Sequence, residues 1–156
     1  MTTTEPVPRI GTSKTERPRV VLACTEPAIQ DVLMNLLKQN GLKVLPSSYL
    51  NETKYLAAEE DLALVICQVR FSDGDFRDLL RFCTRRGLNV PVIVCADFYD
   101  PAVYLEAMEL GAFDYFAYPY HREGMEWIID SALREAQSSE GSNYEERRTA
   151  NDAIPC

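Results

Sequence analysis

Apolar and polar residues follow two different periods along this chain, and the two periods alternate. Apolar residues at three- and four-residue spacing predict helices at about 27–40, 51–60, 75–86, 101–110 and 122–136. Short apolar runs, bounded by charged or turn residues, are typical of buried strands and lie at 20–23, 42–45, 62–69, 90–95 and 113–117. This βα alternation predicts an α/β fold with a parallel sheet, helices on both faces and the strand order 2-1-3-4-5.

The third strand marks the place where chemistry is expected. Its apolar stretch, Leu64 to Phe71, is interrupted by the polar Gln68. In an open parallel sheet, functional side chains lie just beyond the carboxyl ends of the strands. Gln68 therefore stands where a reactive side chain is expected, and it is an amide rather than an acid.

Local signals define several boundaries. Pro46 is expected to end the second strand, because proline cannot donate a hydrogen bond into a central ladder. Asn51 is a candidate N-cap for the second helix, which should turn Tyr55 and Leu56 inward. The apolar stripe of the last helix includes Trp127.

Composition limits the class of protein. The 156 residues are 46% hydrophobic and 26% charged, which is ordinary for one soluble globular domain. A net charge of −8 argues against nucleic acid and anionic membranes as partners, because both would repel the chain. Residues 1–18 and 138–156 lack apolar periodicity and are expected to be disordered on either side of a domain at 19–137. Without a membrane span or signal peptide, we expect a cytoplasmic protein whose five cysteines are reduced.

Four patterns occur in the order and at the spacing of a known family. They are Val20-Val21-Leu22-Ala23 with Glu26-Pro27, Leu64-Val65-Ile66 with Val69-Arg70-Phe71, Val90-Pro91-Val92-Ile93-Val94, and Gly111-Ala112-Phe113-Asp114-Tyr115 with Pro119-Tyr120. The last is the most specific. Together they make residues 19–136 resemble the receiver domain of bacterial two-component response regulators. The resemblance implies a flavodoxin-like, doubly wound (βα)5 fold.

The resemblance also implies a phosphoryl-transfer site. In receivers, a histidine kinase phosphorylates an aspartate at the end of the third strand. Two acids after the first strand hold Mg²⁺, a Thr or Ser follows the fourth strand, and a Lys precedes a proline. This chain departs from the pattern at every position: Cys24 and Thr25 replace the acids, Gln68 the aspartate, Ala96 the hydroxyl residue and Tyr118 the lysine.

Each replacement removes one requirement of the reaction. Mg²⁺ prefers carboxylate oxygens, which Cys24 and Thr25 do not supply, so we expect Mg²⁺ binding to be lost. We also expect that the chain binds no other metal and no cofactor. Gln68 offers no nucleophile for an acyl phosphate, Ala96 no donor and Tyr118 no cation. We therefore expect a degenerate receiver, or pseudo-receiver, that is not an enzyme and signals through protein partners without phosphorylation.

Three alternatives remain open. Glu26, Asp73 and Asp97 lie on loops near the expected site, and Asp97 is the best candidate for a displaced phosphoacceptor. A cysteine-based redox or metal sensor would use Cys24 with a neighbour. Against this, Cys67 and Cys95 should point into the core, away from Gln68 and Ala96 respectively. The third alternative is a flavin-binding protein or an enzyme on the same fold. Against this, the sequence contains no glycine-rich phosphate-binding loop.

The resemblance further implies a switch and an interaction surface. Tyr115 stands at the family's aromatic switch position, and Tyr118-Pro119 at a cis peptide bond. The single histidine, His121, is expected to cap or decorate the last helix. No output domain follows residue 137, so we expect output by association with a protein partner or a second copy, through the face of residues 101–136. The candidate residues of that face are Tyr104, Glu106, Glu109, Asp114, Arg122, Glu126 and Arg134.

Overall fold

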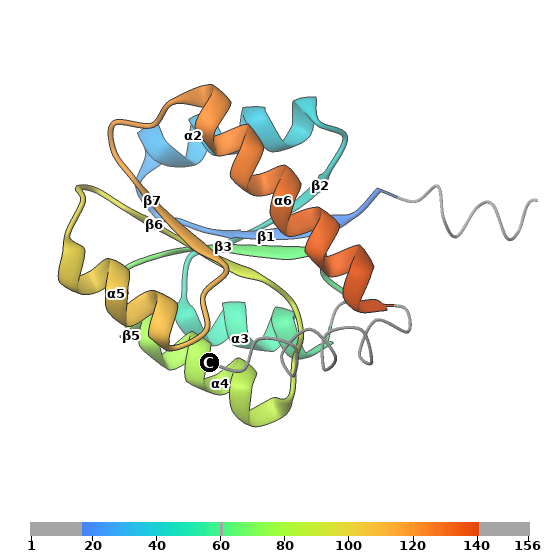
Figure 1. Cartoon of the computed structure of the whole chain (residues 1–156), viewed down its shortest axis with the longest axis vertical. Coiled ribbons are helices and arrows are strands. Elements are labelled where there is room, and N and C mark those ends of the chain that lie inside the picture. The colour runs from blue at the N-terminus through green and yellow to red at the C-terminus, as the bar shows by residue number, and fades with distance from the viewer. Residues whose placement is uncertain (1–16, 60, 141–156) are drawn as a thin grey trace, which may run out of the picture.

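A five-stranded parallel sheet forms the centre of the molecule (Figure 1). The computed structural model describes residues 17–59 and 61–140, with side chains to residue 136. The sheet order is β2-β1-β3-β6-β7, which confirms the predicted order 2-1-3-4-5. Its strands are β1 (Arg19–Ala23), β2 (Lys43–Ser47), β3 (Leu64–Gln68), β6 (Val92–Ala96) and β7 (Asp114–Ala117).

Five helices cover the two faces of this sheet, as predicted. The helices α2 (Pro27–Gln39) and α6 (Arg122–Glu140) lie on one face. The other face carries α3 (Leu50–Glu59), α4 (Phe76–Arg86) and α5 (Pro101–Glu109). Within the described part of the chain, no helix combines the length and apolarity needed to cross a bilayer.

The core lies in two layers because the central strands are covered on both sides. Val21, Val65 and Val94 pack under α3, α4 and α5, whereas Leu22 and Ile66 pack under α2 and α6. Parallel strands buried on both faces need near-continuous apolar sequence, which is why these strands showed no alternation. The same register brings the carboxyl ends of β1, β3 and β6 together at one edge of the sheet.

The second strand runs through Pro46, so the expectation that this proline ends it was wrong. Pro46 pairs with Leu22 of β1, and the strand continues to Ser47. Strand β2 is an edge strand with β1 as its neighbour in the sheet. Proline is tolerated at an edge, where no second partner needs its missing N–H.

The third strand ends at Gln68, and a small hairpin that the sequence did not reveal follows it. Strands β4 (Arg70–Phe71) and β5 (Gly74–Asp75) pair antiparallel. Asp75 then caps α4, with its side chain accepting from the Arg77 N–H, and Asp78 bonds back to the cap backbone. This capping box sets where α4 begins.

The start of α3 is capped from this hairpin and not by Asn51, which corrects the predicted N-cap. The Asp73 carboxylate accepts from the Leu50 N–H at 2.8 Å and from the Asn51 N–H at 2.9 Å. Helix α3 therefore begins at Leu50 and buries Leu50, Thr53 and Ala57. The ring of Tyr55, predicted to point inward, is 64% exposed.

The last helix also differs from its prediction. It buries Met125, Ile129 and Ala132, whereas Trp127 is 66% exposed. It continues to Glu140, four residues past its predicted end. The expected disorder of the first 16 residues and of residues 141–156 lies outside the described residues.

Asp73 provides a test of this capping arrangement. The two backbone hydrogen bonds, first that from Asn51 and then that from Leu50, hold the pKa of Asp73 below its ordinary value of 3.8. A lowered folded-state pKa contributes stability above the ordinary pKa, and that stability is lost as pH falls through the folded-state pKa. We expect Asp73→Ala to lower the free energy of unfolding at pH 7, and the deficit to shrink below about pH 4.

Urea unfolding at several pH values would measure this difference. Asp31→Ala, which removes an exposed acid of α2, is the matched control and should show little change at any pH. A deficit that stays constant down to about pH 2.5 would mean that the charged carboxylate is not what stabilises α3.

Candidate functional site

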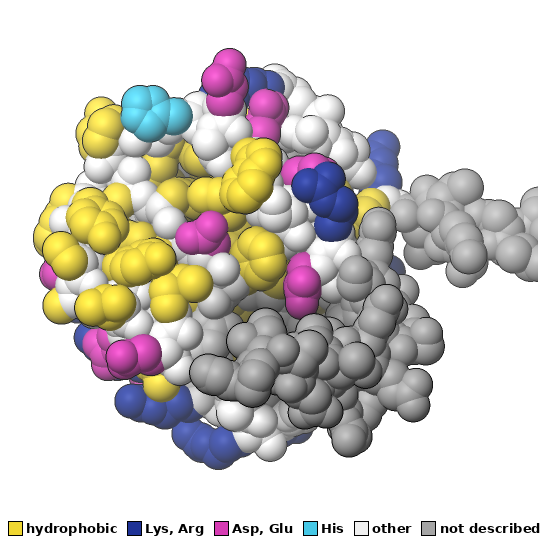
Figure 2. All heavy atoms as spheres, viewed as in Figure 1, with side chains coloured by type: hydrophobic (Ala, Val, Ile, Leu, Met, Phe, Trp, Pro, Cys, Tyr) yellow, Lys and Arg dark blue, Asp and Glu magenta, His cyan; other side chains and the backbone are white. Residues whose placement is uncertain are grey.

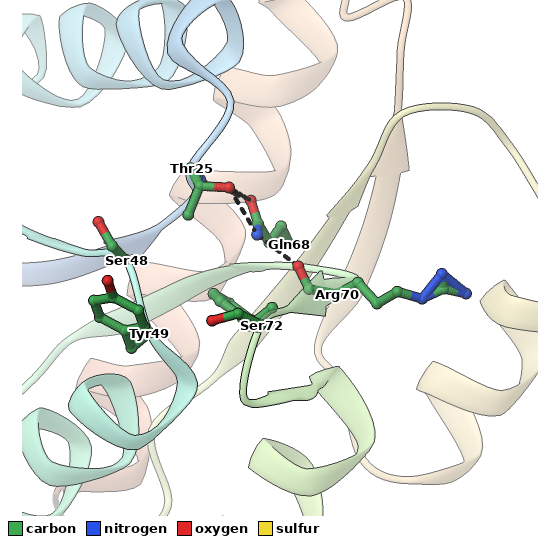
Figure 3. A pocket seen from close by; sticks show the side chains of 7 residues that line it. Thr25, Ser48, Tyr49, Gln68, Arg70 and Ser72 are labelled. Carbon is green, nitrogen blue, oxygen red and sulfur yellow. Dashed lines mark hydrogen bonds between the residues drawn. The ribbon is translucent and has the colours of Figure 1, made fainter.

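The edge where the strands end holds an open pocket of about 400 Å³ (Figure 3). Three loops form it: those after β1, β2 and β3. Its lining is neutral apart from Arg70, whose side chain points away from the labelled hydroxyl groups in Figure 3. The lining residues are Thr25, Ser48, Tyr49, Gln68, Arg70, Phe71 and Ser72.

The Gln68 amide links the first and third loops of this pocket. Its Oε1 accepts from the Thr25 backbone N–H at 2.7 Å and lies 3.3 Å from the Thr25 hydroxyl. Its Nε2 donates to the Arg70 carbonyl at 2.6 Å and to the Thr25 hydroxyl at 3.1 Å. One side chain thus ties the end of β1 to the end of β3 at a distance of 43 residues along the chain.

These bonds satisfy the oxygen atoms that converge in the pocket. The Arg70 carbonyl and the Thr25 hydroxyl would be oxygen ligands for a hard cation, but the amide nitrogen already donates to both. No carboxylate lines the pocket. Within the described residues, no group of three or more His, Cys, Asp or Glu side chains could hold a metal. The donor set therefore does not suit Mg²⁺.

Ala96 and Tyr118 lie at the neighbouring strand ends and do not line the pocket. The Ala96 side chain is buried, and its carbonyl accepts from the Tyr118 N–H and from the Tyr120 hydroxyl, both at 3.0 Å. The Tyr118 ring is 62% exposed and meets the Tyr120 ring edge-on at 5.7 Å. The peptide bond between Tyr118 and Pro119 is cis. The chain just after β7 thus presents a pair of aromatic rings, Tyr118 and Tyr120.

Three acids were candidates to replace the missing phosphoacceptor, and none of them lines the pocket. Both carboxylate oxygens of Asp73 are bonded to the backbone of α3. Glu26 is the N-cap of α2 and makes no side-chain capping bond. Asp97 is exposed on the loop after β6. The structure places each acid on its own loop, outside the lining of the pocket.

The three candidate cysteines do not form one site. Cys67 lies in the core layer under α3, α4 and α5, whereas Cys24 and Cys95 lie in the layer under α2 and α6. All three are buried. The hydrogen bond to Cys95 holds the pKa of Cys24 below its ordinary value, and the same bond, with burial, holds that of Cys95 well above it. Burial also raises the pKa of Cys67.

Tyr115 is held inside the molecule by two backbone groups. Its ring is buried, and its hydroxyl donates to the Phe98 carbonyl and accepts from the Asp100 N–H, both at 3.3 Å. Burial raises the pKa of this hydroxyl, so it remains protonated at neutral pH. The ring therefore fixes the β6–α5 loop without any hydroxyl side chain at position 96.

Sequence reasoning missed the part of the pocket that β2 supplies. Ser48 and Tyr49 follow this edge strand, and Ser72 lies in the hairpin after β3. These three residues belong to no sequence motif that would mark them as part of a site. The available signal was their position, because residues just beyond the carboxyl ends of neighbouring parallel strands share one edge of a sheet.

Two curated response regulators are similar to this sequence. Response regulator protein PilR of Pseudomonas aeruginosa is 25% identical over 118 residues, which are 76% of this chain and 26% of that protein. Response regulator protein TmoT of Ectopseudomonas mendocina is 26% identical over 111 residues, 69% of this chain and 49% of that protein. The chain thus spans about a quarter and about half of these relatives. No protein-family model matches the sequence.

Solved receiver domains share the fold. A CheY-like receiver domain from Methanospirillum hungatei has a TM-score of 0.70 at 19% identity, with 80% of this chain and 99% of that chain covered. The receiver domain of an HD domain-containing protein from Pseudomonas fluorescens has a TM-score of 0.71 at 20% identity, covering 78% and 98%. The beryllofluoride-activated NtrC4 receiver domain, solved as a dimer, has a TM-score of 0.70 at 22% identity, covering 76% and 98%.

Replacing Gln68 by Glu tests the hydrogen-bond network of the pocket. The substitution keeps the side-chain shape and removes the donor to Arg70 and Thr25, so a carboxylate oxygen would face a carbonyl oxygen. We expect Gln68→Glu to lower the free energy of unfolding by about 1–3 kcal/mol at pH 7.5. The pKa of the introduced carboxyl group should be raised, because its protonated form restores a donor.

A raised folded-state pKa means that the loss of stability vanishes below the ordinary Glu pKa of about 4.3 and grows as pH rises. Chemical unfolding of the variant and the parent between pH 4.5 and 8 would measure it. Gln30→Glu on α2 is the control, with an expected change within about 0.5 kcal/mol. If Gln68→Glu were as stable as the parent at pH 8, the amide would not hold the loops together.

Proposed function

We propose that this chain, which has the fold of response-regulator receiver domains and a sequence similar to response regulators, is a receiver-type signalling module that acts through protein partners and is not itself phosphorylated. The observation that carries the proposal is the hydrogen-bonded Gln68 amide in the pocket. It stands at the phosphoacceptor position and occupies the oxygens that a cation would need. We further propose that the chain is not an enzyme and binds no Mg²⁺.

Aspartyl phosphorylation has chemical requirements that the residues of this pocket do not meet, and this supports the proposal. An acyl phosphate needs a carboxylate nucleophile, and the Gln68 amide has none. Charge developing on the phosphoryl group must be stabilised by a metal and by positioned cations or donors. Here the nearby strand ends present a buried Ala96 and an exposed Tyr118.

A receiver that is phosphorylated on a displaced acid such as Asp97 is an alternative with less support. Asp97 is exposed on the loop after β6, and the pocket lining offers no second carboxylate with which to share a cation. An exposed carboxylate without a metal gains none of the transition-state stabilisation that phosphoryl transfer depends on.

The held position of Tyr115 supports a module with one resting conformation. In this fold the ring bridges β7 and the β6–α5 loop through the Phe98 and Asp100 backbone groups. Moving it outward would leave those groups and its own hydroxyl without these bonds, at a cost of about 1–3 kcal/mol. We propose that a bound partner, rather than phosphate, supplies any energy that shifts it.

The proposed partner surface is the face formed by α5, β7 and α6. Several of its charged residues are already paired within the chain, namely Glu106 with Arg77 at 2.6 Å and Arg122 with Glu126 at 3.3 Å. The hydrogen bond from Arg77 keeps the pKa of Glu106 below its ordinary value. Glu109 and the partly buried Tyr104 remain as candidate contacts, for a protein partner or for a second copy of the chain.

A thiol-based sensor is the second candidate, and the contact of Cys24 with Cys95 is the observation that favours it. A disulfide between them would join β1 and β6, which β3 separates. Two strand spacings amount to about 9.6 Å, whereas the Cα atoms of a disulfide lie about 4.4–6.8 Å apart. The bond would therefore require the strand ends to move, which makes this candidate the weaker one.

Exposure to a small phosphodonor tests the leading proposal. After incubation with acetyl phosphate and Mg²⁺, the intact mass of the full chain should be unchanged, because no carboxylate lines the pocket and the described residues hold no cluster of metal ligands. Gln68→Asp should also remain unmodified, since Cys24 and Thr25 still supply no acid pair. A stoichiometric phosphoryl adduct on the parent chain would overturn the proposal.

A positive control comes from restoring the whole pattern. The variant Cys24→Asp, Thr25→Asp, Gln68→Asp, Ala96→Thr and Tyr118→Lys should gain an adduct or measurable Mg²⁺ binding under the same conditions. Ready phosphorylation of Gln68→Asp alone would show that the acid pair is dispensable in this pocket.

Thiol titration separates the second candidate from the first. Cys24, Cys67, Cys83 and Cys95 are buried, and burial raises the pKa of Cys83 to about 11. We expect these four thiols to resist an aromatic disulfide reagent at pH 7.5 and to react only when the chain is unfolded, because all four are buried and burial raises the pKa of Cys67 and Cys83. Fast reaction of Cys24 in the native protein, lost in Cys24→Ser, would favour the sensor.

A further inference from the structure

The carboxyl-terminal half of the described chain carries an apolar surface that its own fold leaves uncovered. Hydrophobic side chains gather over α5 and the loops beside it, at the left of Figure 2. We call this the aromatic surface. It consists of Phe98, Tyr99, Leu105 and Tyr118, which are 65%, 58%, 57% and 62% exposed. Contiguous exposed apolar side chains on a soluble domain commonly mark an interaction site.

The aromatic surface rests on an ordered layer of rings. Tyr99 lies 6.2 Å from Tyr104 and 5.9 Å from Tyr115, and the last two rings are 5.7 Å apart and edge-on. The Tyr115 hydroxyl also bonds to the Phe98 carbonyl. Because Tyr99 and the Phe98 backbone are already held by these contacts, a partner would lose little free energy in ordering this part of the surface.

The half of the chain that carries this surface is strongly negative, although α4 brings Arg77 against Glu106 of α5. Residues 97–140 contain ten acidic and two basic side chains, a net charge of −8 that equals the charge of the whole chain. Both basic residues are paired with acids of their own helix, Arg122 with Glu126 and Arg134 with Asp130. Residues 17–96 contain nine acidic and ten basic residues, so the asymmetry belongs to the α5–β7–α6 half.

This charge disfavours a second copy of the chain as the occupant. In a twofold symmetric dimer the same patch faces itself, so acids would meet acids. The basic residues of α4 could attract the acidic half of another copy in an unequal contact. However, none of the large exposed hydrophobic side chains in the described residues lies on α4, so that contact would leave the aromatic surface uncovered.

We infer that the aromatic surface docks a basic amphipathic segment of another protein, whose apolar side chains cover Phe98, Tyr99, Leu105 and Tyr118 while its lysines or arginines meet the surrounding acids. This deepens the proposed function, on which it rests, by naming the chemistry of the partner. Apolar anchors with a complementary charged rim are the usual composition of a peptide-binding surface. The net negative charge of this half disfavours nucleic acid and anionic lipid as occupants.

A defined peptide probe tests the inference on the full chain. The probe is a synthetic helix of about 18 residues with Leu and Trp on one face and Lys on the other. One control peptide replaces each Lys by Glu, and another replaces each Leu and Trp by Ser. Fluorescence anisotropy should show binding of the first peptide only, and its affinity should fall several-fold between about 50 and 300 mM salt.

Matched variants locate the site on the chain. Phe98→Ser with Leu105→Ser should weaken binding about tenfold or more, as loss of central anchors does. Tyr55→Ser removes an equally exposed ring from α3, 64% against 65% for Phe98, and should leave binding unchanged. Glu109→Lys with Glu123→Lys should weaken binding at low salt, whereas Asp31→Lys with Glu59→Lys on the other half should do so much less.

The outcomes are distinguishable. The inference is overturned if the acidic peptide binds equally well, if Tyr55→Ser weakens binding as much as the aromatic-surface variant, or if sedimentation shows a micromolar dimer that Leu105→Ser dissolves. Each of these leaves the phosphodonor result untouched, so the proposed function would survive. A phosphoryl adduct, by contrast, would overturn the proposed function whatever the peptide does.

Discussion

The hydrogen bonds of one amide link two of the loops at the edge where the parallel strands of the sheet end. Gln68 accepts from the Thr25 backbone and donates to the Arg70 carbonyl, so a neutral side chain joins the loops after β1 and β3. In a metal-dependent site, a cation would bridge those loops and need carboxylates to hold it. An amide has both a donor and an acceptor in one plane, so it can satisfy converging oxygens and a backbone N–H without any ion.

Two further sets of hydrogen bonds lie at the neighbouring strand ends. The Ala96 carbonyl is bonded by Tyr118 and Tyr120, and the Tyr115 hydroxyl is bonded by the β6–α5 loop. These tyrosines supply hydrogen bonds inside the molecule at the ends of β6 and β7. The same residues and their neighbours bring aromatic rings to the surface beside α5.

Much of the fold could be predicted, because burial on both faces leaves a continuous apolar run that few other structures produce. The order of the five strands followed from the alternation with helices and was confirmed. The errors were all local. Asn51 is a good cap by residue type, yet Asp73 lies closer to the start of α3 once the β4–β5 hairpin has formed. Tyr55 and Trp127 fit apolar stripes by spacing, but packing chose Thr53, Ala57 and Ala132 for the interior, since small side chains let these helices approach the sheet.

The sequence by itself determined which chemistry the site lacks. The sequence has no acid at positions 24, 25 and 68, no hydroxyl group at 96 and no cation at 118. No conformation can supply a functional group that the residue types lack. Only the tertiary structure decided what the residues at these positions do. The partners of the Gln68 amide are 43 residues behind it and two residues ahead, and Asp73 is diverted to α3 by contacts of the same kind. Hydrogen bonds act over about 3 Å, so they depend on which strand ends the sheet brings together, and the order of residues alone does not specify that.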